Sequence, residues 1–223
     1  MQVPEDGMLL LVDKPLTWTS FDVVKKIKYG LKLKKIGHAG TLDPLATGLL
    51  LLGVGKYTKK LHDLQGKDKA YEGILEIGKT TPSYDLETDF DTVTTIDHLT
   101  NRDLLAARDQ LTGSIEQIPP AHSAVKVNGK RAYKLARKNE EVELKKRNIK
   151  IYQFELTSIE LPEVHFKVQC SKGTYIRSLA HDFGKKMGVG AYLKALRRTA
   201  IGEYHVQDAQ TIDEVLKTYS SEL

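Results

Sequence analysis

The feature that most constrains the fold is a pair of short apolar runs, MLLLV at residues 8–12 and LLLL at residues 49–52. Uninterrupted runs of this length are typical of buried strands, and they are far too short to cross a bilayer. The second run follows directly on a loop of Gly, Thr and Pro that contains a lone aspartate, Asp43. Because a carboxylate beside a buried strand is costly unless it is paired or used, this loop is either a solvated turn or a site.

Length and cysteine content narrow the class of protein. A chain of 223 residues fits one large domain or two small ones and can bury a sizeable core. Cys170 is the single cysteine, which excludes an internal disulfide and a thiolate zinc cluster. The start of the chain, MQVPEDGM, is acidic and lacks the basic flank of a secretory signal. The sequence therefore predicts a cytoplasmic protein without a membrane partner.

Charge is distributed unevenly along the chain. Residues 25–35 carry six lysines and no acid, and residues 121–150 carry ten Lys and Arg against three Glu. Residues 81–110, by contrast, hold seven acids and two arginines. Segregated basic blocks suit binding to a phosphate backbone, because each neutralised phosphate releases counterions. A solvated lysine-rich face is the alternative interpretation.

Helical spacing is clearest in two segments. Residues 19–31 are expected to form a helix capped by Thr19 or Ser20, and residues 173–187 a second helix with Arg177 at the edge of its apolar stripe. The apolar stripe expected for the first helix consists of Phe21, Val24, Ile27 and Leu31. Further helices are expected at 56–64, at 101–111 after an Asn101 cap, and at 211–219.

A strand is expected at 8–14, where Pro15 ends the apolar run. Further strands are expected in segments whose residues alternate between apolar and polar or stay apolar, at 48–55, 69–78, 163–171 and 199–206. There is no internal repeat and no obvious linker. These elements predict a single mixed α+β domain over residues 1–223, with a largely antiparallel central sheet flanked by helices.

Several kinds of site are absent from the sequence. There is no phosphate-binding Gly-Lys-Ser/Thr loop and no dinucleotide fingerprint, and the seven histidines lack metal-ligand spacing. For Asp43, local chemistry alone favours a turn residue that accepts backbone hydrogen bonds. However, the glycines at 37, 40 and 48 permit close approach by a bulky ligand, and His38 can both stack and hydrogen-bond.

Six motifs in order resemble one enzyme family. The segment GHAGTLDPLATGLL resembles the catalytic loop of the TruB family of tRNA pseudouridine synthases. The other five motifs, which together with this loop extend over about residues 8 to 205, are LLVDKPLTWTSFDVV, KAYEGILEIGKTTPSYD, QIPPAHSAVKVNGKRAYKLAR, CSKGTYIRSLAHDFG and ALRRTAIGEY. The resemblance implies the pseudouridine synthase fold. It also implies an isomerase that needs no cofactor and no metal.

The resemblance assigns roles to individual residues. Asp43 is implied to be the carboxylate that acts on the uridine; attack at C1′, attack at C6 and a glycal route all stay open. Arg177 would keep Asp43 ionised, where a surface arginine is the alternative. Tyr71 would stack on the uracil or accept a proton, where sheet packing is the alternative. Leu196 would form an apolar wall. Lys14 would support the loop or contact RNA, where helix or turn packing is the alternative.

The implied partner is the T-arm stem-loop of tRNA, with the target uridine at position 55. That uridine must be flipped out of the folded loop, and His38 would fill the vacated space. Expected phosphate contacts lie in a basic insertion near residues 121–150, at Lys126, Lys130, Arg131, Arg137 and Arg147. The chain stops about twenty residues after GEYHV, so no C-terminal PUA module is expected. No obligatory protein partner is expected either, and the chain is expected to be a monomer.

Three other functions are compatible with parts of this pattern. An RNA-binding or RNA-chaperone protein could keep the fold without turnover. A related synthase could be positioned by a guide RNA within a larger assembly. A nucleoside hydrolase could use the same carboxylate to release a free base, although the long basic blocks would then have no purpose.

Overall fold

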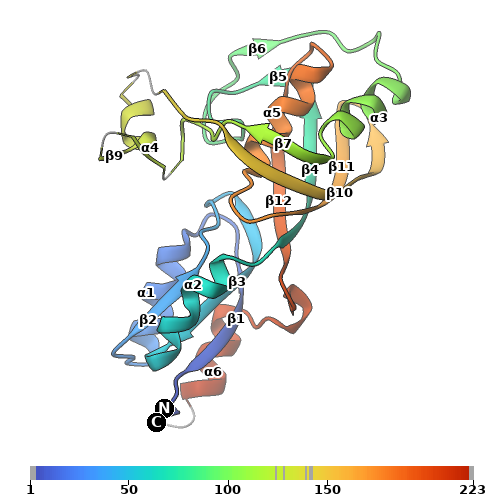
Figure 1. Ribbon diagram of the computed structural model, residues 1–223. Coiled ribbons are helices and arrows are strands. Elements are labelled where there is room, and N and C mark those ends of the chain that lie inside the picture. The colour runs from blue at the N-terminus through green and yellow to red at the C-terminus, as the bar shows by residue number, and fades with distance from the viewer. Residues whose placement is uncertain (1–3, 124, 128, 139, 141–142, 221–223) are drawn as a thin grey trace. The chain divides into compact units, whose positions relative to one another are not determined.

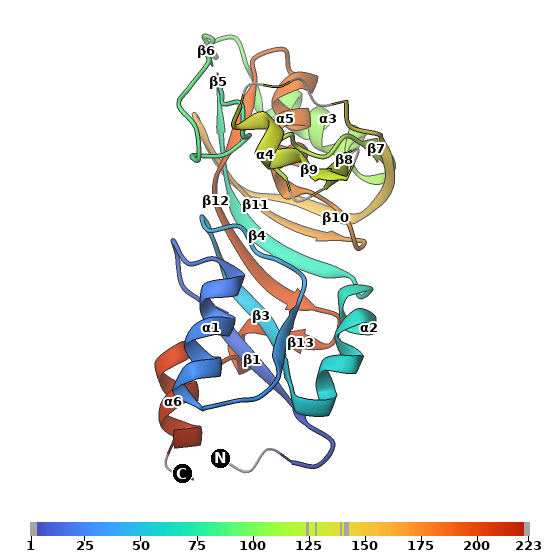
Figure 2. The same cartoon turned by 90° about the vertical axis from the view of Figure 1, so that its left-hand side faces the viewer.

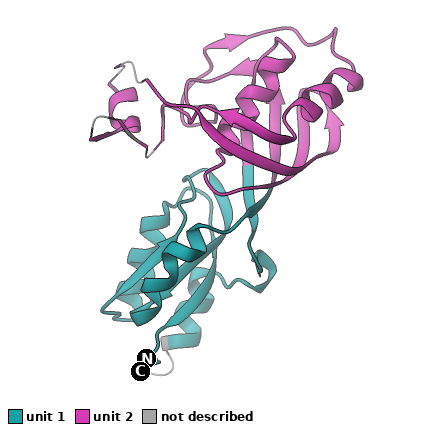
Figure 3. Cartoon of the chain, in the orientation of Figure 1, with its two compact units in different colours: residues 1–71, 196–223 teal, residues 72–195 magenta. Residues whose placement is uncertain are grey.

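The computed structural model describes residues 4–123, 125–127, 129–138, 140 and 143–220. It divides into two compact units: unit 1 consists of residues 1–71 and 196–223, and unit 2 of residues 72–195 (Figure 3). Strands β4 (Lys69–Ile77) and β12 (Ala191–Ile201) contribute to both units. The fold is mixed α+β with largely antiparallel strand pairing, as the sequence predicts.

Strand β3 (Ala46–Val54) is the central strand of unit 1 (Figure 1). Strand β1 (Met8–Lys14) pairs antiparallel with it, so that Leu10 lies opposite Leu52 and Val12 opposite Leu50. The remaining strands of this unit also join through β3. Strand β12 pairs parallel with the start of β3, β2 (Ile36–Ala39) pairs antiparallel with its end, and β13 (Tyr204–His205) pairs with β12.

Helices cover both faces of β1 and β3, which explains why their sequences are apolar without alternation (Figure 2). On one face, α1 (Ser20–Gly30) and α6 (Ile212–Ser220) pack on Leu10, Val12, Leu50, Leu52 and Val54. On the other face, α2 (Leu61–Gln65), which follows the 3₁₀ turn Gly55–Lys60, packs with Leu9, Leu11, Leu49 and Leu51.

Helix α1 confirms one detail of the sequence prediction and corrects another. Thr19 is the N-cap: its hydroxyl accepts from the Asp22 N–H, while the Asp22 carboxylate accepts from Thr19 in return. The prediction that Phe21 belongs to the apolar stripe is wrong, because Phe21 is 67 % exposed. The buried side of α1 is centred about 100° away from Phe21, on Val23, Val24 and Ile27.

Unit 2 contains the strand order β12-β4-β11-β10-β7. Its strands β7 (Gly113–Gln117), β10 (Arg147–Glu160) and β11 (Glu163–Cys170) pair antiparallel. Phe183 of helix α5 (Ile176–Lys186) packs against Phe154 of β10. The ring of Phe154 also meets the ring of Phe166 of β11 edge-on. A helix is present within the expected range 173–187, although it begins only at Ile176. Of the stripe that helical spacing predicts, Ile176, Leu179, Ala180 and Phe183 are buried and Met187 is half-buried.

The rest of unit 2 departs in places from the sequence prediction. Helix α3 (Asn101–Gln110) is present, but its cap is Thr100 rather than the expected Asn101, so the cap lies one residue earlier than predicted. Strand β10 was not predicted, and β12 starts at Ala191, well before the expected strand at 199–206. The smaller elements are β5 (Lys79–Thr80), β6 (Thr92–Val93), β8 (Lys126–Val127), β9 (Lys130–Arg131), α4 (Ala132–Ala136) and the 3₁₀ turn Val206–Asp208.

We expect Gly48→Ala to destabilise the protein by at least about 3 kcal/mol, because an alanine Cβ would overlap the Arg198 carbonyl oxygen and Gly48 has φ +100°. Gly188 provides a matched control, since its φ is +74° but nothing lies within 4 Å of a Cβ there. Gly188→Ala should cost only about 1 kcal/mol. Urea denaturation followed by circular dichroism measures both values, and similar losses would contradict the steric argument.

Candidate active site

The Asp43 loop is anchored to α1 by one buried hydroxyl. The Ser20 hydroxyl accepts a hydrogen bond from the Leu42 N–H at 2.9 Å and donates one to the Leu42 carbonyl at 3.1 Å. The Ala46 N–H donates to the Asp43 carbonyl at 3.0 Å, closing a turn that leads into β3. Asp43 itself is half-buried. The loop that carries the carboxylate is thus fixed on both sides of Asp43.

Lys14 holds the same loop from β1. Its side chain is fully buried, and its ammonium donates to the carbonyls of Pro15 at 2.9 Å, Trp18 at 2.6 Å and Pro44 at 3.4 Å. Burial lowers the pKa of Lys14 to about 8, although the negative charge of Asp43 opposes this shift. Of the two roles predicted for Lys14, this position fits support of the loop.

Arg198, which the sequence analysis did not single out, is the third group that holds the loop. Its side chain is 1 % exposed, and it donates to the carbonyls of Leu49 at 2.8 Å, Gly40 at 3.2 Å and Thr41 at 3.4 Å. Burial lowers the pKa of its guanidinium, while Tyr71 and Asp43 act in the opposite direction. The motif ALRR was the signal available in the sequence, but nothing in it distinguished this arginine from its neighbours.

Tyr71 is buried and hydrogen-bonds Arg198. A guanidinium has no acceptor, so the phenol oxygen accepts and its own proton points elsewhere. Leu196 lies in β12 directly opposite Ala46 of β3, three residues beyond Asp43. The structure therefore brings Asp43, Lys14, Tyr71, Leu196 and Arg198 together within unit 1.

The neighbouring arginine has a different task. Arg197 forms a two-pronged ion pair with Asp13 of β1, at 3.0 and 2.6 Å, and both side chains are about one-third exposed. Arg197 thereby ties β12 to β1 across β3. Of these adjacent arginines, Arg197 forms a partly exposed ion pair at the surface of unit 1, and Arg198 forms hydrogen bonds in its interior.

His38 lies on β2 and is half-buried. Burial lowers the pKa of its imidazole, a hydrogen bond to the Gly40 backbone opposes this, and the charge of Arg198 lowers the pKa further. Among the described residues its Nδ1 has no hydrogen-bond partner. Burial and the charge of Arg198 thus favour the neutral form of the imidazole, and its Nδ1 is itself buried.

Arg177 belongs to unit 2 and is buried there near the start of α5, so it is not the surface arginine of the alternative interpretation. Its Nε lies 3.5 Å from the carboxylate of Asp85, which is also buried. It donates as well to the carbonyls of Ser83 at 3.2 Å and His122 at 2.9 Å. The predicted role of Arg177 beside Asp43 joins residues of both units and stays a prediction. Asp85 was missed because nothing in the acidic loop distinguishes it.

The residues predicted to contact phosphate are exposed where they are described. Lys130 and Arg131 form β9, Arg137 pairs with Glu87 at 2.6 Å, and the Arg147 guanidinium lies 6.0 Å from the centre of the Tyr175 ring. The side chain of Lys126 lies outside the described residues. These positions leave the role of the basic insertion as a prediction.

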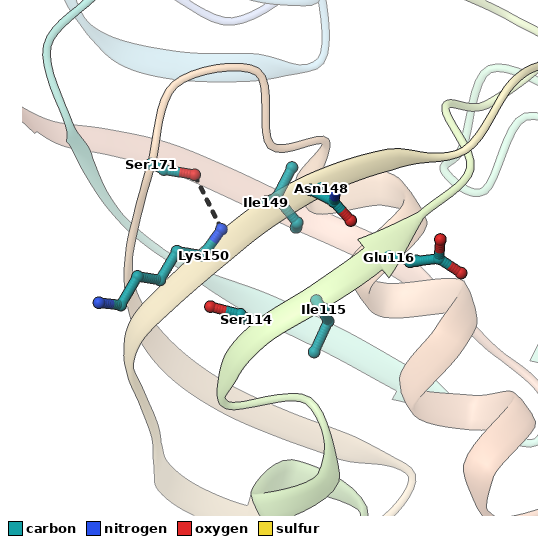
Figure 4. Close-up of a pocket in the computed structure, with 7 residues that line it drawn as sticks. All are labelled: Ser114, Ile115, Glu116, Asn148, Ile149, Lys150 and Ser171. Atoms are coloured by element: carbon teal, nitrogen blue, oxygen red, sulfur yellow. Dashed lines mark hydrogen bonds between the residues drawn. The ribbon is translucent and has the colours of Figure 1, made fainter.

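A shallow hollow of about 330 Å³ lies along β7 and β10 in unit 2 (Figure 4). The Lys150 N–H donates to the Ser171 hydroxyl at 2.9 Å at its edge. Its lining residues are Ser114, Ile115, Glu116, Asn148, Ile149, Lys150 and Ser171. No residue predicted for the site lines this hollow, so the Asp43 loop stays the candidate.

Two features are absent from the described residues. No group of three or more His, Cys, Asp or Glu side chains there is arranged to hold a metal ion. In the same residues, no helix is both long and apolar enough to cross a membrane.

Comparison with known proteins identifies the family of the chain. A family model described as "TruB family pseudouridylate synthase (N terminal domain)" matches residues 28–176, and one described as "tRNA pseudouridylate synthase B C-terminal domain" matches residues 177–222. The chain belongs to the TruB family of pseudouridylate synthases.

Curated members of the TruB family match nearly the whole chain. A "tRNA pseudouridine synthase B" of Flavobacterium johnsoniae is 53 % identical over 211 residues, which cover 92 % of each chain. A protein of the same name from Chlorobaculum tepidum is 51 % identical over 217 residues, which cover 95 % of this chain and 90 % of that one.

Solved structures with the same fold are larger proteins. The chain matches one from "Crystal Structure of a Cbf5-Nop10-Gar1 Complex" with a TM-score of 0.74 and 30 % identity, over 96 % of this chain and 55 % of that one. It matches one from "Structure of H/ACA RNP bound to a substrate RNA containing 2'-deoxyuridine" with a TM-score of 0.71 and 27 % identity, over 96 % and 53 %. The chain thus spans about half the length of these solved relatives.

Lys14 makes the stability of unit 1 depend on pH. Its pKa is about 8 in the folded protein against an ordinary 10.5, so between these values the unfolded chain binds more protons. Stability relative to Lys14→Met should therefore rise with pH, by about 2 kcal/mol between pH 8 and pH 10. Urea denaturation of both proteins at several pH values measures this difference. A difference that stays constant or falls with pH would contradict burial of the charged ammonium.

The two adjacent arginines should differ in their effect on stability. Arg198→Met leaves buried carbonyls without donors and should cost at least about 3 kcal/mol. Arg197→Met removes a partly exposed ion pair and should cost no more than about 1 kcal/mol. Chemical denaturation of the two variants provides the comparison. Equal losses would show that Arg198 does not hold the loop as described.

Proposed function

We propose that this chain converts a uridine of tRNA to pseudouridine, and that its target is the T-loop uridine at position 55. The proposal rests on family membership together with one structural observation. A half-buried carboxylate, Asp43, lies on a loop whose backbone is fixed by the buried side chains of Lys14, Ser20 and Arg198. Such fixed positioning is what attack on a single extruded nucleotide requires.

The charges around Asp43 support its role as the reacting carboxylate. Lys14 and Arg198 both interact electrostatically with Asp43. Nearby cations favour an ionised carboxylate even after a bound base excludes water. A carboxylate in this state can attack carbon at C1′ or C6, or stabilise the positive charge that develops on the ribose. In each case the N1–C1′ bond breaks, the uracil turns over, and C5 bonds to C1′.

Tyr71 is suited to two steps of this reaction. Its ring can stack on the uracil, and its oxygen accepts a hydrogen bond from Arg198. A guanidinium donor favours the phenolate form over the phenol. Tyr71 can therefore take up the proton that C5 must lose after the new bond forms.

The other predicted residues would recognise the flipped nucleotide. Leu196 offers an apolar wall beside the loop, and the half-buried ring of His38 can stack and hydrogen-bond in the space that the uridine leaves. We propose that Arg177, which now pairs with Asp85, supports Asp43 in the RNA complex. Lys130, Arg131, Arg137 and Arg147, with Lys126, would contact phosphates.

The direct test is incubation of the purified protein with an unmodified T-arm stem-loop, followed by carbodiimide mapping of pseudouridine with primer extension. Wild type should give a stop at the T-loop uridine. Asp43→Asn should reduce the rate at least about 10³-fold, because an amide cannot replace a carboxylate nucleophile. Asp63→Asn, an aspartate at the exposed start of α2, is the matched control and should behave as wild type.

Other outcomes favour the alternative functions. Binding of the stem-loop without conversion would overturn the enzyme proposal in favour of an RNA-binding protein. Conversion only when a guide RNA is added would support a guide-positioned synthase. Release of free uracil would identify a hydrolase.

A further inference from the structure

Helix α1 turns two large aromatic side chains to solvent. Phe21 is 67 % exposed and Tyr29 is 69 % exposed, more than most apolar side chains of this chain. They are eight residues apart, which separates them by about 12 Å along the helix axis and by about 80° around it. Tyr29 lies opposite the stripe that packs on β1 and β3, whereas Phe21 lies about 100° from the centre of that stripe, and both side chains are on the solvent side of α1.

Lysines accompany these aromatic side chains. Lys25 lies between Phe21 and Tyr29 on the same side of the helix, because it is four residues from each. The exposed lysines on α1 and the turn after it are Lys25, Lys26, Lys32, Lys34 and Lys35. Within the described part of the chain, none of them has a carboxylate oxygen within 4.0 Å. Asp22, the acid of this face, accepts hydrogen bonds from Thr19 at the helix cap and also interacts electrostatically with Lys25.

Aromatic rings interleaved with unpaired lysines fit one kind of partner. Every nucleic-acid base offers a face for stacking, and each nucleotide carries one phosphate, so single-stranded RNA matches both features at once. At about 3.4 Å per stacked nucleotide, the separation of Phe21 and Tyr29 corresponds to three or four nucleotides. An acidic protein would satisfy the lysines but would leave the exposed rings without a specific partner.

Helix α1 also begins at the catalytic loop. Ser20, the residue before Phe21, is the one whose hydroxyl holds both backbone groups of Leu42. From that contact the helix extends over its 11 residues, about 16 Å. An RNA strand with one nucleotide at Asp43 would therefore reach the outer side of α1 within a few nucleotides.

We propose that the outer face of α1, defined by Phe21, Lys25, Lys26, Tyr29 and Lys32, binds unpaired nucleotides that flank the target uridine. Phe21 and Tyr29 stack on bases, and the lysines contact phosphates. This inference rests on the proposed function, because it takes the RNA substrate from there. It adds a second recognition surface that lies outside the basic insertion.

The test measures the affinity of a full-length unmodified tRNA transcript by fluorescence anisotropy at several salt concentrations. Phe21→Ala and Tyr29→Ala should each weaken binding at least about fivefold, the lower end of one base–aromatic stack. Phe21→Tyr should bind as tightly as wild type, because it keeps an aromatic ring. Phe21→Leu, which keeps an apolar side chain without a π-face, should bind as weakly as Phe21→Ala. Tyr152→Ala removes another exposed aromatic residue, on β10, and should leave affinity unchanged.

The lysines give a separate measurement. Replacing Lys25 and Lys32 by Gln should reduce the slope of log Kd against log salt by about 1.4, because each phosphate contact to a single strand contributes about 0.7. The aromatic variants should leave this slope unchanged.

The outcomes separate this inference from the proposed function. If wild type converts the tRNA but the α1 variants bind as tightly as wild type, or if Phe21→Leu binds as well as Phe21→Tyr, the inference is overturned and the enzyme stands. If wild type neither binds nor converts the tRNA, both are overturned. Weakened binding with retained conversion of saturating RNA would support both.

Discussion

The site in unit 1 depends on one buried guanidinium. Arg198 can lie inside the unit only because the carbonyls of Gly40, Thr41 and Leu49 accept its hydrogen bonds, since a buried charge without partners would be very costly. The same bonds stop those carbonyls from moving. The same hydrogen bonds therefore offset the cost of burying the charge and make the loop rigid. A change that removed them would affect both.

The other anchors complete this arrangement from different directions. Lys14 reaches the loop from β1, Ser20 from the start of α1, and Arg198 from β12. These three elements are distant in sequence, but each packs on or pairs with β3 and its neighbours. The loop before β3 is thus fixed by the same elements that bury its apolar run. This explains why a loop rich in Gly and Thr can hold a carboxylate in one position.

The sequence was informative where a single segment carries its own pattern. The apolar runs predicted β1 and β3, the spacing of Val24, Ile27 and Leu31 predicted α1, and six motifs identified the family. It failed where the answer depends on what another element does. Phe21 fits the helical period, yet the side of α1 that packs on the sheet is centred about 100° away from it. Asp85 and Arg198 resemble any loop aspartate or strand arginine until tertiary contacts bury them.

The two buried arginines show how local compensation shapes chemistry. Arg177 has a carboxylate of its own in unit 2, Asp85, and additional carbonyl acceptors. Arg198 is compensated by carbonyls, by the Tyr71 oxygen and by the charge of Asp43. Tyr71 and Asp43, the two groups proposed to react, are also those that stabilise Arg198. Any change in their charge during the reaction therefore changes their electrostatic interaction with the guanidinium that holds the loop. A hydrogen-bond donor that is already fixed in place can stabilise such a charge without having to reorient. This is the electrostatic preorganisation on which such catalysis depends.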